Sequence, residues 1–369
     1  PFFNTYHNLD MSCDRLQWDL NEGKIIFSGD IGVSGASSIS FFSDTYFSQG
    51  LYDHLGEWGE RHPLRLVRQA SQKLQKDTIS LDEMKYFMPY DEADIILYLC
   101  QLTNMGFIYY DVDRKKFTVK PRVARYITAS YGLLDYDVLK FVSDPNLKGI
   151  AELDLSSYDL DLFGMTYFEL SDSQKVYIFP RENHGKKKKN RDILFSGHIN
   201  AGMFDFYVTE AFFSFEDFDI DMATVDSISF QVESFDPTKV DLYGNRDLER
   251  VRTTLQDVSG TLEIDKPDNK SGIKRFTEYP IFSCKTHAFT YYDEKQIHNG
   301  TYIRDRFFYK IDPFVIDSLD NFKTTGLKFT GVFKSAGIFQ DLYDPLKVRP
   351  DYSLGFVHET STAGLPAYG

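Results

Sequence analysis

The chain has 369 residues, more than one ordinary domain needs, so we expect two or three structural units. A net charge of −14 with 33 phenylalanines and 24 tyrosines is typical of a folded, sheet-rich protein and argues against a disordered acidic tail. The acidic balance repels phosphate backbones, which argues against nucleic acid as the partner of the whole chain.

The cysteines, the apolar runs and the chain ends each add one expectation. Three widely spaced cysteines without a CxxC pair predict no disulfide framework and no cysteine-bound metal. No apolar run approaches the roughly 20 residues that cross a bilayer, so we expect no transmembrane segment. Because the sequence starts at Pro1 and stops in a Gly/Pro-rich stretch, residues 363–369, we interpret it as an internal fragment of a longer protein.

The first segment, residues 1–54, has the pattern of β-strands. Residues 24–27 combine β-branched and aromatic side chains, and residues 39–42 resume that pattern after a glycine-containing stretch. Such runs between glycines predict short strands.

The second segment, residues 55–130, changes to helical character. Pro63 suits the first turn of a helix. Ser80, followed three residues later by Glu83, forms a capping box at the start of a second helix. Asp91 can cap a third helix with its carboxylate. The sequence therefore predicts three helices in a row.

A predicted hairpin at residues 107–119 follows these helices, and this order resembles a winged-helix module. In DNA-binding members of that class, basic and amide side chains of the third helix contact the major groove. Here residues 89–110 contain no Lys or Arg, and the nearest basic cluster is the hairpin tip with Arg114, Lys115 and Lys116. We therefore expect a protein-binding or structural insert and keep a DNA-binding protein as an alternative.

The third segment, residues 149–369, returns to strands. Short runs with alternating apolar and polar residues, such as residues 151–155 and 204–207, are separated by Asp, Ser, Asn and Gly turns. No strict repeat period is present. The predicted fold class is mainly β, an irregular β-solenoid or a large β-sandwich, with a small α+β winged-helix-like insert.

A lysine run is the strongest charge feature of the chain. It lies between two predicted strands, so a solvated hairpin tip is expected, and the alternative is an anion-binding loop for phospholipid head groups, glycan phosphates or an acidic protein. The residues concerned are Lys186, Lys187, Lys188, Lys189 and Arg191.

Alternating carboxylates form a second charged pattern. Asp217, Asp219 and Asp221 alternate with Phe218 and Ile220, which would place the carboxylates on one face of a strand. Calcium prefers such oxygen ligands, but the spacing lacks the glycine turn and closing glutamate of a calcium loop. We expect an ordinary solvent-facing row, and the sequence predicts no metal site and no cofactor.

Aromatic residues gather in the segment 289–311. They could stack on sugar rings or form a protein interface, and the alternative is cross-strand packing within a sheet. The predicted contact surface comprises Tyr291, Tyr292, Tyr302, Phe307 and Tyr309.

Catalytic motifs are missing from the sequence. The eight histidines are scattered, and there is no HExxH, GxSxG, phosphate loop or dinucleotide fingerprint. We therefore name no catalytic residue and favour a non-enzymatic protein. A glycan-active enzyme stays an alternative, because carboxylates brought together from distant strands leave no motif.

Several short motifs, at residues 16–19, 190–192 and 311–314, resemble a group of large β-repeat-rich proteins of Bacteroidetes. The residue pattern of the segment 327–333 is also similar to that of the AsmA and TamB group of envelope-bridging proteins. The resemblance implies a structural or interaction scaffold of the cell envelope, periplasmic or associated with the outer membrane. A protein or envelope component is the expected partner, and a β-solenoid glycan-binding or glycan-active protein is the first alternative.

Overall fold

The structure, a computed structural model, is mainly β and confirms the predicted fold class. It describes residues 2–29, 31–32, 35–36, 38–144, 150–295, 297–323 and 326–368. Within these ranges, no helix is both long and apolar enough to span a bilayer.

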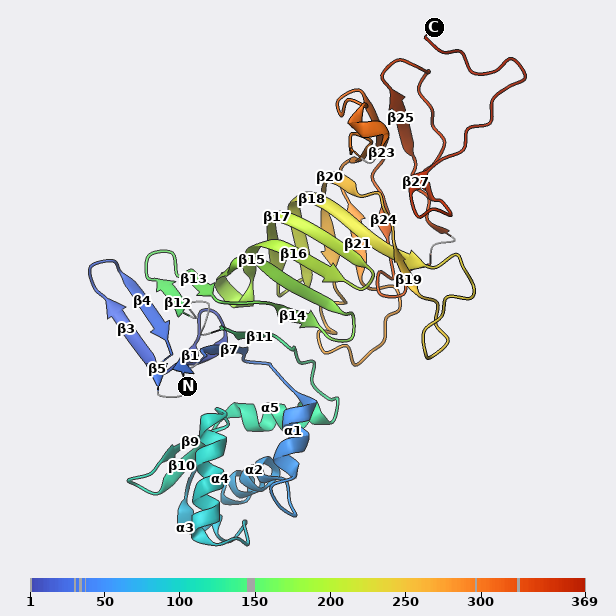
Figure 1. Ribbon diagram of the computed structural model, residues 1–369. Coiled ribbons are helices and arrows are strands. Elements are labelled where there is room, and N and C mark those ends of the chain that lie inside the picture. The colour runs from blue at the N-terminus through green and yellow to red at the C-terminus, as the bar shows by residue number, and fades with distance from the viewer. Residues whose placement is uncertain are drawn as a thin grey trace. The chain divides into compact units, whose positions relative to one another are not determined.

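The chain folds into two units, each built from separate stretches of sequence (Figure 1). Unit 1 comprises Pro1–Leu160, Lys189–Arg191 and Asp268–Lys274, and unit 2 comprises Asp161–Lys188, Asp192–Pro267 and Arg275–Gly369. The predicted segments 1–54 and 55–130 both fall within unit 1. The predicted start of the third segment, residue 149, lies outside the described residues.

Outside the helical insert, the described residues of unit 1 form two larger antiparallel groups of strands and one two-stranded pair. The first group has the order β1 (Phe2–Asn4), β2 (Leu9–Ser12), β7 (Ser40–Ser43), β11 (Lys140–Val142). The second group joins β3 (Arg15–Asp19), β4 (Lys24–Ser28) and β12 (Ile150–Asp154), and the two-stranded pair is β5 (Ile31–Gly32) with β6 (Gly35–Ala36). The strands predicted at residues 24–27 and 39–42 are therefore confirmed.

The helical insert of unit 1 has more elements than the sequence predicted. In chain order they are α1 (Gln49–Gly56), α2 (Pro63–Leu74), β8 (Thr78–Ser80), α3 (Leu81–Met84), α4 (Glu92–Asn104), β9 (Ile108–Asp111), β10 (Lys116–Val119) and α5 (Pro121–Ser130). β8, β10 and β9 form a three-stranded antiparallel sheet. The likeness to a winged-helix module stays a prediction.

The helix starts of the insert follow the predicted signals with one exception. Ser80 and Glu83 form the capping box, with the Glu83 carboxylate 2.9 Å from the Ser80 amide. Pro63 occupies the first turn of α2, as predicted. Asp91 precedes α4, but its side chain makes no capping hydrogen bond, so the proposed capping role of this carboxylate is wrong.

The interior of the insert is aromatic. The buried Tyr126 of α5 packs against Phe47 at a ring distance of 4.7 Å and against Phe107 at 5.0 Å. Arg122, one turn earlier, lies over the Phe107 ring and pairs with Asp10 at 3.0 Å, so its charge is compensated where it is buried. Burial of these rings against α2 and α4 stabilises the insert.

A buried carboxylate lies in the strand region of unit 1. Asp137 is 1% exposed and accepts hydrogen bonds from the Ser43 and Thr45 hydroxyls, each at 2.6 Å. Its second oxygen accepts from the Leu139 amide at 2.9 Å. Burial raises the pKa of Asp137, and these hydrogen bonds oppose that effect.

Two short distant segments complete unit 1. Arg191 donates to Asp44 at 2.8 Å, and its Nη1 lies 4.0 Å from Asp137. Ser271 donates to Asp135 through its amide at 2.9 Å and its hydroxyl at 2.7 Å. Polar contacts therefore tie residues far along the chain into this unit.

Unit 2 contains a long antiparallel sheet whose main strands follow one another along the chain (Figure 1). They are β15 (Val176–Lys187), β16 (Ile193–Ala201), β17 (Phe204–Ser214), β18 (Asp219–Glu233), β20 (Leu255–Glu263), β22 (Ala288–Tyr291), β23 (Phe307–Ile311) and β25 (Gly331–Ser335). Shorter strands are β13 (Leu160–Phe163), β14 (Phe168–Ser171), β19 (Leu248–Arg250), β21 (Ile281–Cys284), β24 (Val315–Ile316), β26 (Lys347–Val348) and β27 (Leu354–Gly355).

The two faces of this sheet differ because side chains alternate along each strand. Ile178, Ile199 and Phe206 are each 0% exposed on one face. The Phe206 ring lies 4.9 Å from the ring of Phe282 on β21, so side chains of β17 and β21 pack together on that face. The residues between these positions point to the opposite, accessible face, and that face carries the candidate site.

Candidate functional site

Three rings form a row across β15, β16 and β17 on the accessible face. Phe179 is the register partner of His198, and His198 is the register partner of Tyr207. The Phe179 and His198 rings lie 5.3 Å apart at 19°, and the His198 and Tyr207 rings lie 4.9 Å apart at 12°. Because the rings stack face to face, each holds its neighbour upright on the sheet.

Tyr207 also borders a cavity. This cavity has a volume of about 370 Å³, and its lining includes residues of β18, β19 and the chain leading into β20, on the side of β17 opposite to β16. We call it the Tyr207 pocket. It is lined by Tyr207, Ser229, Arg250, Val251, Arg252 and Thr254.

A carboxylate beside the pocket organises the surrounding polar groups. Asp205 lies 2.8 Å from Nε2 of His198 and accepts from the amide of Asn200 at 3.0 Å. Arg250 donates to Asp205 at 3.2 Å and to the hydroxyl of Ser229 at 2.8 Å. One connected network therefore fixes the ring row and one pocket arginine.

The charge of Asp205 follows from these contacts. Burial alone would raise its pKa, but hydrogen bonds from His198 and Asn200, with the charges of His198 and Arg250, outweigh burial and hold the pKa below its usual range. The carboxylate is therefore ionised at neutral pH and accepts from Nε2–H of His198. That bond fixes the orientation of the imidazole ring.

Gly197 allows β16 to lie close to β15. Gly197, next to His198, has φ 146°, and a Cβ at this position would lie 2.3 Å from the carbonyl oxygen of Phe179. The register of β16 against β17 shifts between Phe195 and Gly197. Only glycine allows this close approach, which sets His198 directly opposite Phe179.

The predicted anion-binding loop is not a solvated tip. Lys186 and Lys187 belong to β15, Lys187 is 0% exposed, and Lys186 pairs with Asp161 at 3.4 Å. Lys188 is half-buried, and Lys189 is exposed. The Arg191 side chain is only 12% exposed and pairs with Asp44. The expected solvated tip is therefore wrong for Lys187 and Arg191, which are buried or nearly so. Anion binding by this loop stays a prediction.

The predicted aromatic contact surface is largely packed against itself. Tyr302 and Phe307 stack at 4.1 Å, and Tyr292 lies 5.7 Å from Phe307, with burial raising the pKa of Tyr292. Tyr309 is 0% exposed and donates to the carbonyl of Asp344 at 2.8 Å, so it cannot be part of a contact surface. These rings pack against one another, which agrees in part with the alternative prediction of cross-strand packing within a sheet.

Tyr291 is partly accessible, as are Tyr292, Tyr302 and Phe307. Its hydroxyl donates to Asp257 at 2.7 Å, and Arg304 lies 3.6 Å from the ring centre. A cation therefore already covers this ring. Its use as a contact surface stays a prediction.

The predicted carboxylate row lies only partly on a strand. Asp219 and Asp221 belong to β18, whereas Asp217 and Phe218 lie in the turn before it, so the prediction is wrong for those two residues. Phe218 and Ile220 are each 0% exposed, whereas Asp221 is exposed and accepts from Lys285 at 2.8 Å. Burial, together with Asp217, Asp221 and Glu263, raises the pKa of Asp219 to about 6. Across the described ranges, no group of three or more His, Cys, Asp or Glu side chains is arranged to hold a metal ion.

The residues of the Tyr207 pocket were not predicted as a site. A signal was nevertheless present, since His198, Asn200, Asp205 and Tyr207 are placed symmetrically about the turn between β16 and β17. Polar residues at such positions pair across a hairpin on one face. The arginines beyond β18 have no comparable signal in the sequence.

Fold and site together define a mainly β protein with an antiparallel sheet whose accessible face carries a small polar pocket with an aromatic wall. Comparisons of this chain with known protein families, with curated proteins and with solved structures find no match.

Proposed function

We propose that the chain is a non-enzymatic binding protein whose Tyr207 pocket holds one negatively charged sugar unit of a glycan. One observation carries the proposal. The ring of Tyr207 is stacked on His198, and Tyr207 lines a pocket together with Arg250 and Arg252. An aromatic face packs against the apolar C–H face of a sugar ring, and guanidinium groups bind carboxylate, sulfate or phosphate.

The pocket favours binding over catalysis. Cleavage of a glycosidic bond ordinarily requires two carboxyl groups on either side of the bond. No carboxylate is among the described residues that line the pocket, and Asp205 beside it is occupied by His198, Asn200 and Arg250. The polar groups are therefore arranged to orient a ligand.

The wider proposal is a scaffold that displays this pocket and also contacts a protein. Exposed apolar side chains on the helical insert support a protein contact, since Leu97 is 54% and Tyr109 61% exposed. An acidic start of α4 argues against DNA there, although Glu92 is paired with Lys85 and Lys115. A place in the cell envelope stays a prediction.

Calorimetric titration of the full chain tests the glycan proposal. The probes are oligogalacturonate, its methyl-esterified form, which has the same rings without the charge, and sulfated and phosphorylated oligosaccharides. We expect saturable binding of at least one charged probe. Tyr207→Leu and Arg252→Gln should each weaken it about fivefold, because one removes the stacking face and the other a charged donor.

Matched controls separate the pocket from general effects. Tyr243 is 90% exposed and Arg275 is exposed, and neither lines the Tyr207 pocket. Tyr243→Leu and Arg275→Gln should leave affinity unchanged. Equal weakening by the controls, or no saturable binding of any charged probe, would refute the proposal.

A further inference from the structure

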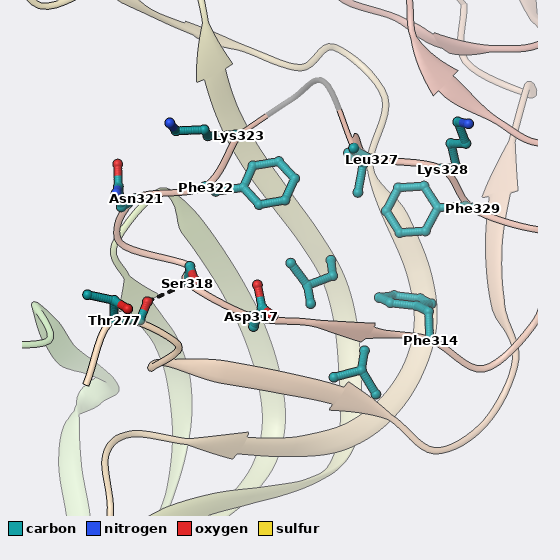
Figure 2. A pocket seen from close by; sticks show the side chains of 13 residues that line it. Thr277, Phe314, Asp317, Ser318, Asn321, Phe322, Lys323, Leu327, Lys328 and Phe329 are labelled. Carbon is teal, nitrogen blue, oxygen red and sulfur yellow. Dashed lines mark hydrogen bonds between the residues drawn. The ribbon is translucent and has the colours of Figure 1, made fainter.

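A second and larger cavity of unit 2 is lined by rings that the fold already covers. It has a volume of about 530 Å³ and is bounded by β24 and the chain that follows it. Figure 2 shows its lining, in which Asp317, Asn321 and Lys323 are polar. The Phe322 and Phe329 rings are at most 8% exposed, so this cavity offers little apolar surface. A group of apolar side chains that stays uncovered lies in unit 1, on and beside β3.

β3 is the outermost strand of its group (Figure 1). Within the described residues it pairs with β4 alone, with Arg15 opposite Ser28 and Asp19 opposite Lys24. Its other edge therefore presents backbone amides and carbonyls that no strand of the described chain uses. Such an edge pairs readily with a strand of another chain.

One face of β3 is apolar and uncovered. Leu16 and Trp18 are 45% and 60% exposed, and they share this face because side chains alternate along a strand. Leu20, directly after the strand, is 77% exposed. The register partner of Trp18 on β4 is Ile25, which is also partly accessible. Large apolar side chains grouped in this way beside a free strand edge are typical of an interface.

The charges of β3 are placed symmetrically about its centre. The strand reads Arg15, Leu16, Gln17, Trp18, Asp19, so opposite charges lie two positions to either side of Gln17. When two copies of this strand run antiparallel with Gln17 opposite Gln17, each Arg15 lies opposite Asp19 of the other copy, and each Leu16 lies opposite Trp18. A parallel arrangement in register would instead place Arg15 beside Arg15. The charge pattern therefore favours one orientation and one register.

The acidic end of β3 is positioned before any second copy binds. Oδ1 of Asp19 accepts from the amides of Asn21 and Glu22 at 2.9 and 3.1 Å, which fixes the carboxylate at the end of the strand. The register partner of Asp19, Lys24, lies 3.5 Å from the carboxylate of Glu152. This lysine is therefore drawn toward another carboxylate, and Asp19 keeps capacity for a guanidinium group.

We propose that β3 pairs with β3 of a second copy of this chain, antiparallel and centred on Gln17, in a two-fold symmetric dimer. Arg15, which is exposed, then pairs with Asp19 of the other copy on both sides of the axis, and Leu16 contacts Trp18 of the other copy on the apolar face. A strand of five residues gives a small interface, so association is reversible and depends on concentration. This interface goes beyond glycan binding and does not depend on it.

Sedimentation velocity of the full chain across the micromolar range tests the dimer and its charge pairs. The wild-type chain should pass from monomer to dimer as its concentration rises. Arg15→Asp should raise the dissociation constant of the dimer about tenfold or more, because two attractions become two repulsions. Asp19→Arg should do the same, since it places two arginines opposite each other on both sides of the axis.

A mixture of the two variants separates lost pairing from lost folding. An equimolar mixture of Arg15→Asp and Asp19→Arg chains should dimerise like the wild type, because every pair of positions 15 and 19 again joins opposite charges. Arg61→Asp, an exposed position outside β3, makes the same change in net charge as Arg15→Asp and should leave dimerisation unchanged. A wild-type chain or a mixture that stays monomeric, or an equal loss in Arg61→Asp, would overturn the proposal.

Disulfide trapping tests the register. Gln17→Cys, combined with Cys13→Ser to remove the neighbouring thiol, should give a covalent dimer under mild oxidation, because residues directly opposite each other lie within disulfide reach. Asn21→Cys with Cys13→Ser should not, because this exposed position lies four residues from the centre and the two copies of it fall on opposite sides of the axis. Equal trapping at both positions would contradict the assigned pairing.

Discussion

Replacement of Asp137 by alanine tests the buried network of unit 1. The change removes a fully buried acceptor that holds the Ser43 and Thr45 hydroxyls and the Leu139 amide. Arg191 keeps its partner Asp44 at 2.8 Å, so its charge is not left alone. The main consequence is therefore a buried Leu139 amide that loses its side-chain acceptor and two hydroxyls, 3.2 Å apart, that keep only each other as acceptors within the described residues.

The size of the effect follows from these contacts. An unsatisfied buried donor costs about 1–3 kcal/mol, and removal of one member of a buried charged network costs about 3–5 kcal/mol. Water can reach Thr45, which is only half-buried, and hydrate its hydroxyl. We expect Asp137→Ala to lower the free energy of unfolding of unit 1 by about 3 kcal/mol. Asp137→Asn keeps the shape and one acceptor, so its cost should be about half as large.

Urea unfolding followed by tryptophan fluorescence measures this loss. The chain has two tryptophans, Trp18 and Trp58, and both belong to unit 1, so the signal reports on that unit. Asp113→Ala, in the exposed turn between β9 and β10, serves as a control with an expected change within about 0.5 kcal/mol. A loss below about 1 kcal/mol for Asp137→Ala would refute the reasoning.

Three further changes test unit 2. Asp219→Asn should stabilise β18 at pH 7, as measured by hydrogen exchange. The pKa of Asp219 is about 6 in the native state and about 3.9 in the unfolded state, so the stability of the wild-type protein falls as the pH rises from about 3.9 to about 6. Gly197→Ala should lower the thermal unfolding temperature in circular dichroism, at a cost of roughly 1–3 kcal/mol, because its Cβ collides with a carbonyl. His198→Ala should weaken glycan binding in calorimetry by loosening Tyr207 without touching the ligand.

Each of these predictions has an outcome that contradicts it. If the Asp219→Asn chain keeps the wild-type pH slope between pH 4 and pH 6, the titration of Asp219 is not the source of that slope. Gly244 also has a positive φ, but a Cβ added there would have no atom within 4 Å, so Gly244→Ala should cost less than Gly197→Ala. Unchanged glycan affinity in His198→Ala would show that Tyr207 needs no support from the imidazole.

Local patterns in the sequence predicted much of the fold. The alternation of Asp219, Ile220 and Asp221 gave the correct faces at the start of β18, because the side-chain period of a strand is two. The Ser80 and Glu83 pair marked the start of α3, because a capping box is formed by residues three apart. Such signals depend on neighbours within one turn or one strand.

Features set by distant residues could not be predicted. Lys187 belongs to a charge run, yet pairing of β15 with its neighbours buries it. The Tyr207 pocket combines Tyr207 with Arg250 and Arg252, which are brought together only by the register of β17, β18 and β19. No spacing rule in a single sequence fixes that register. The helix α5 was missed, although Val123, Tyr126 and Ile127 have helical spacing.

Unit 1 consists of three separate stretches of the chain, and this affects the order in which its contacts form during protein synthesis. Its last segment ends at Lys274, so a ribosome must translate most of the sheet of unit 2 before the contacts of Ser271 with Asp135 can form. Until then, the nascent unit 1 lacks its final stretch of chain. A polypeptide cut after residue 160 would lack the Arg191 and Ser271 contacts altogether, so Asp44 and Asp135 would lose these partners.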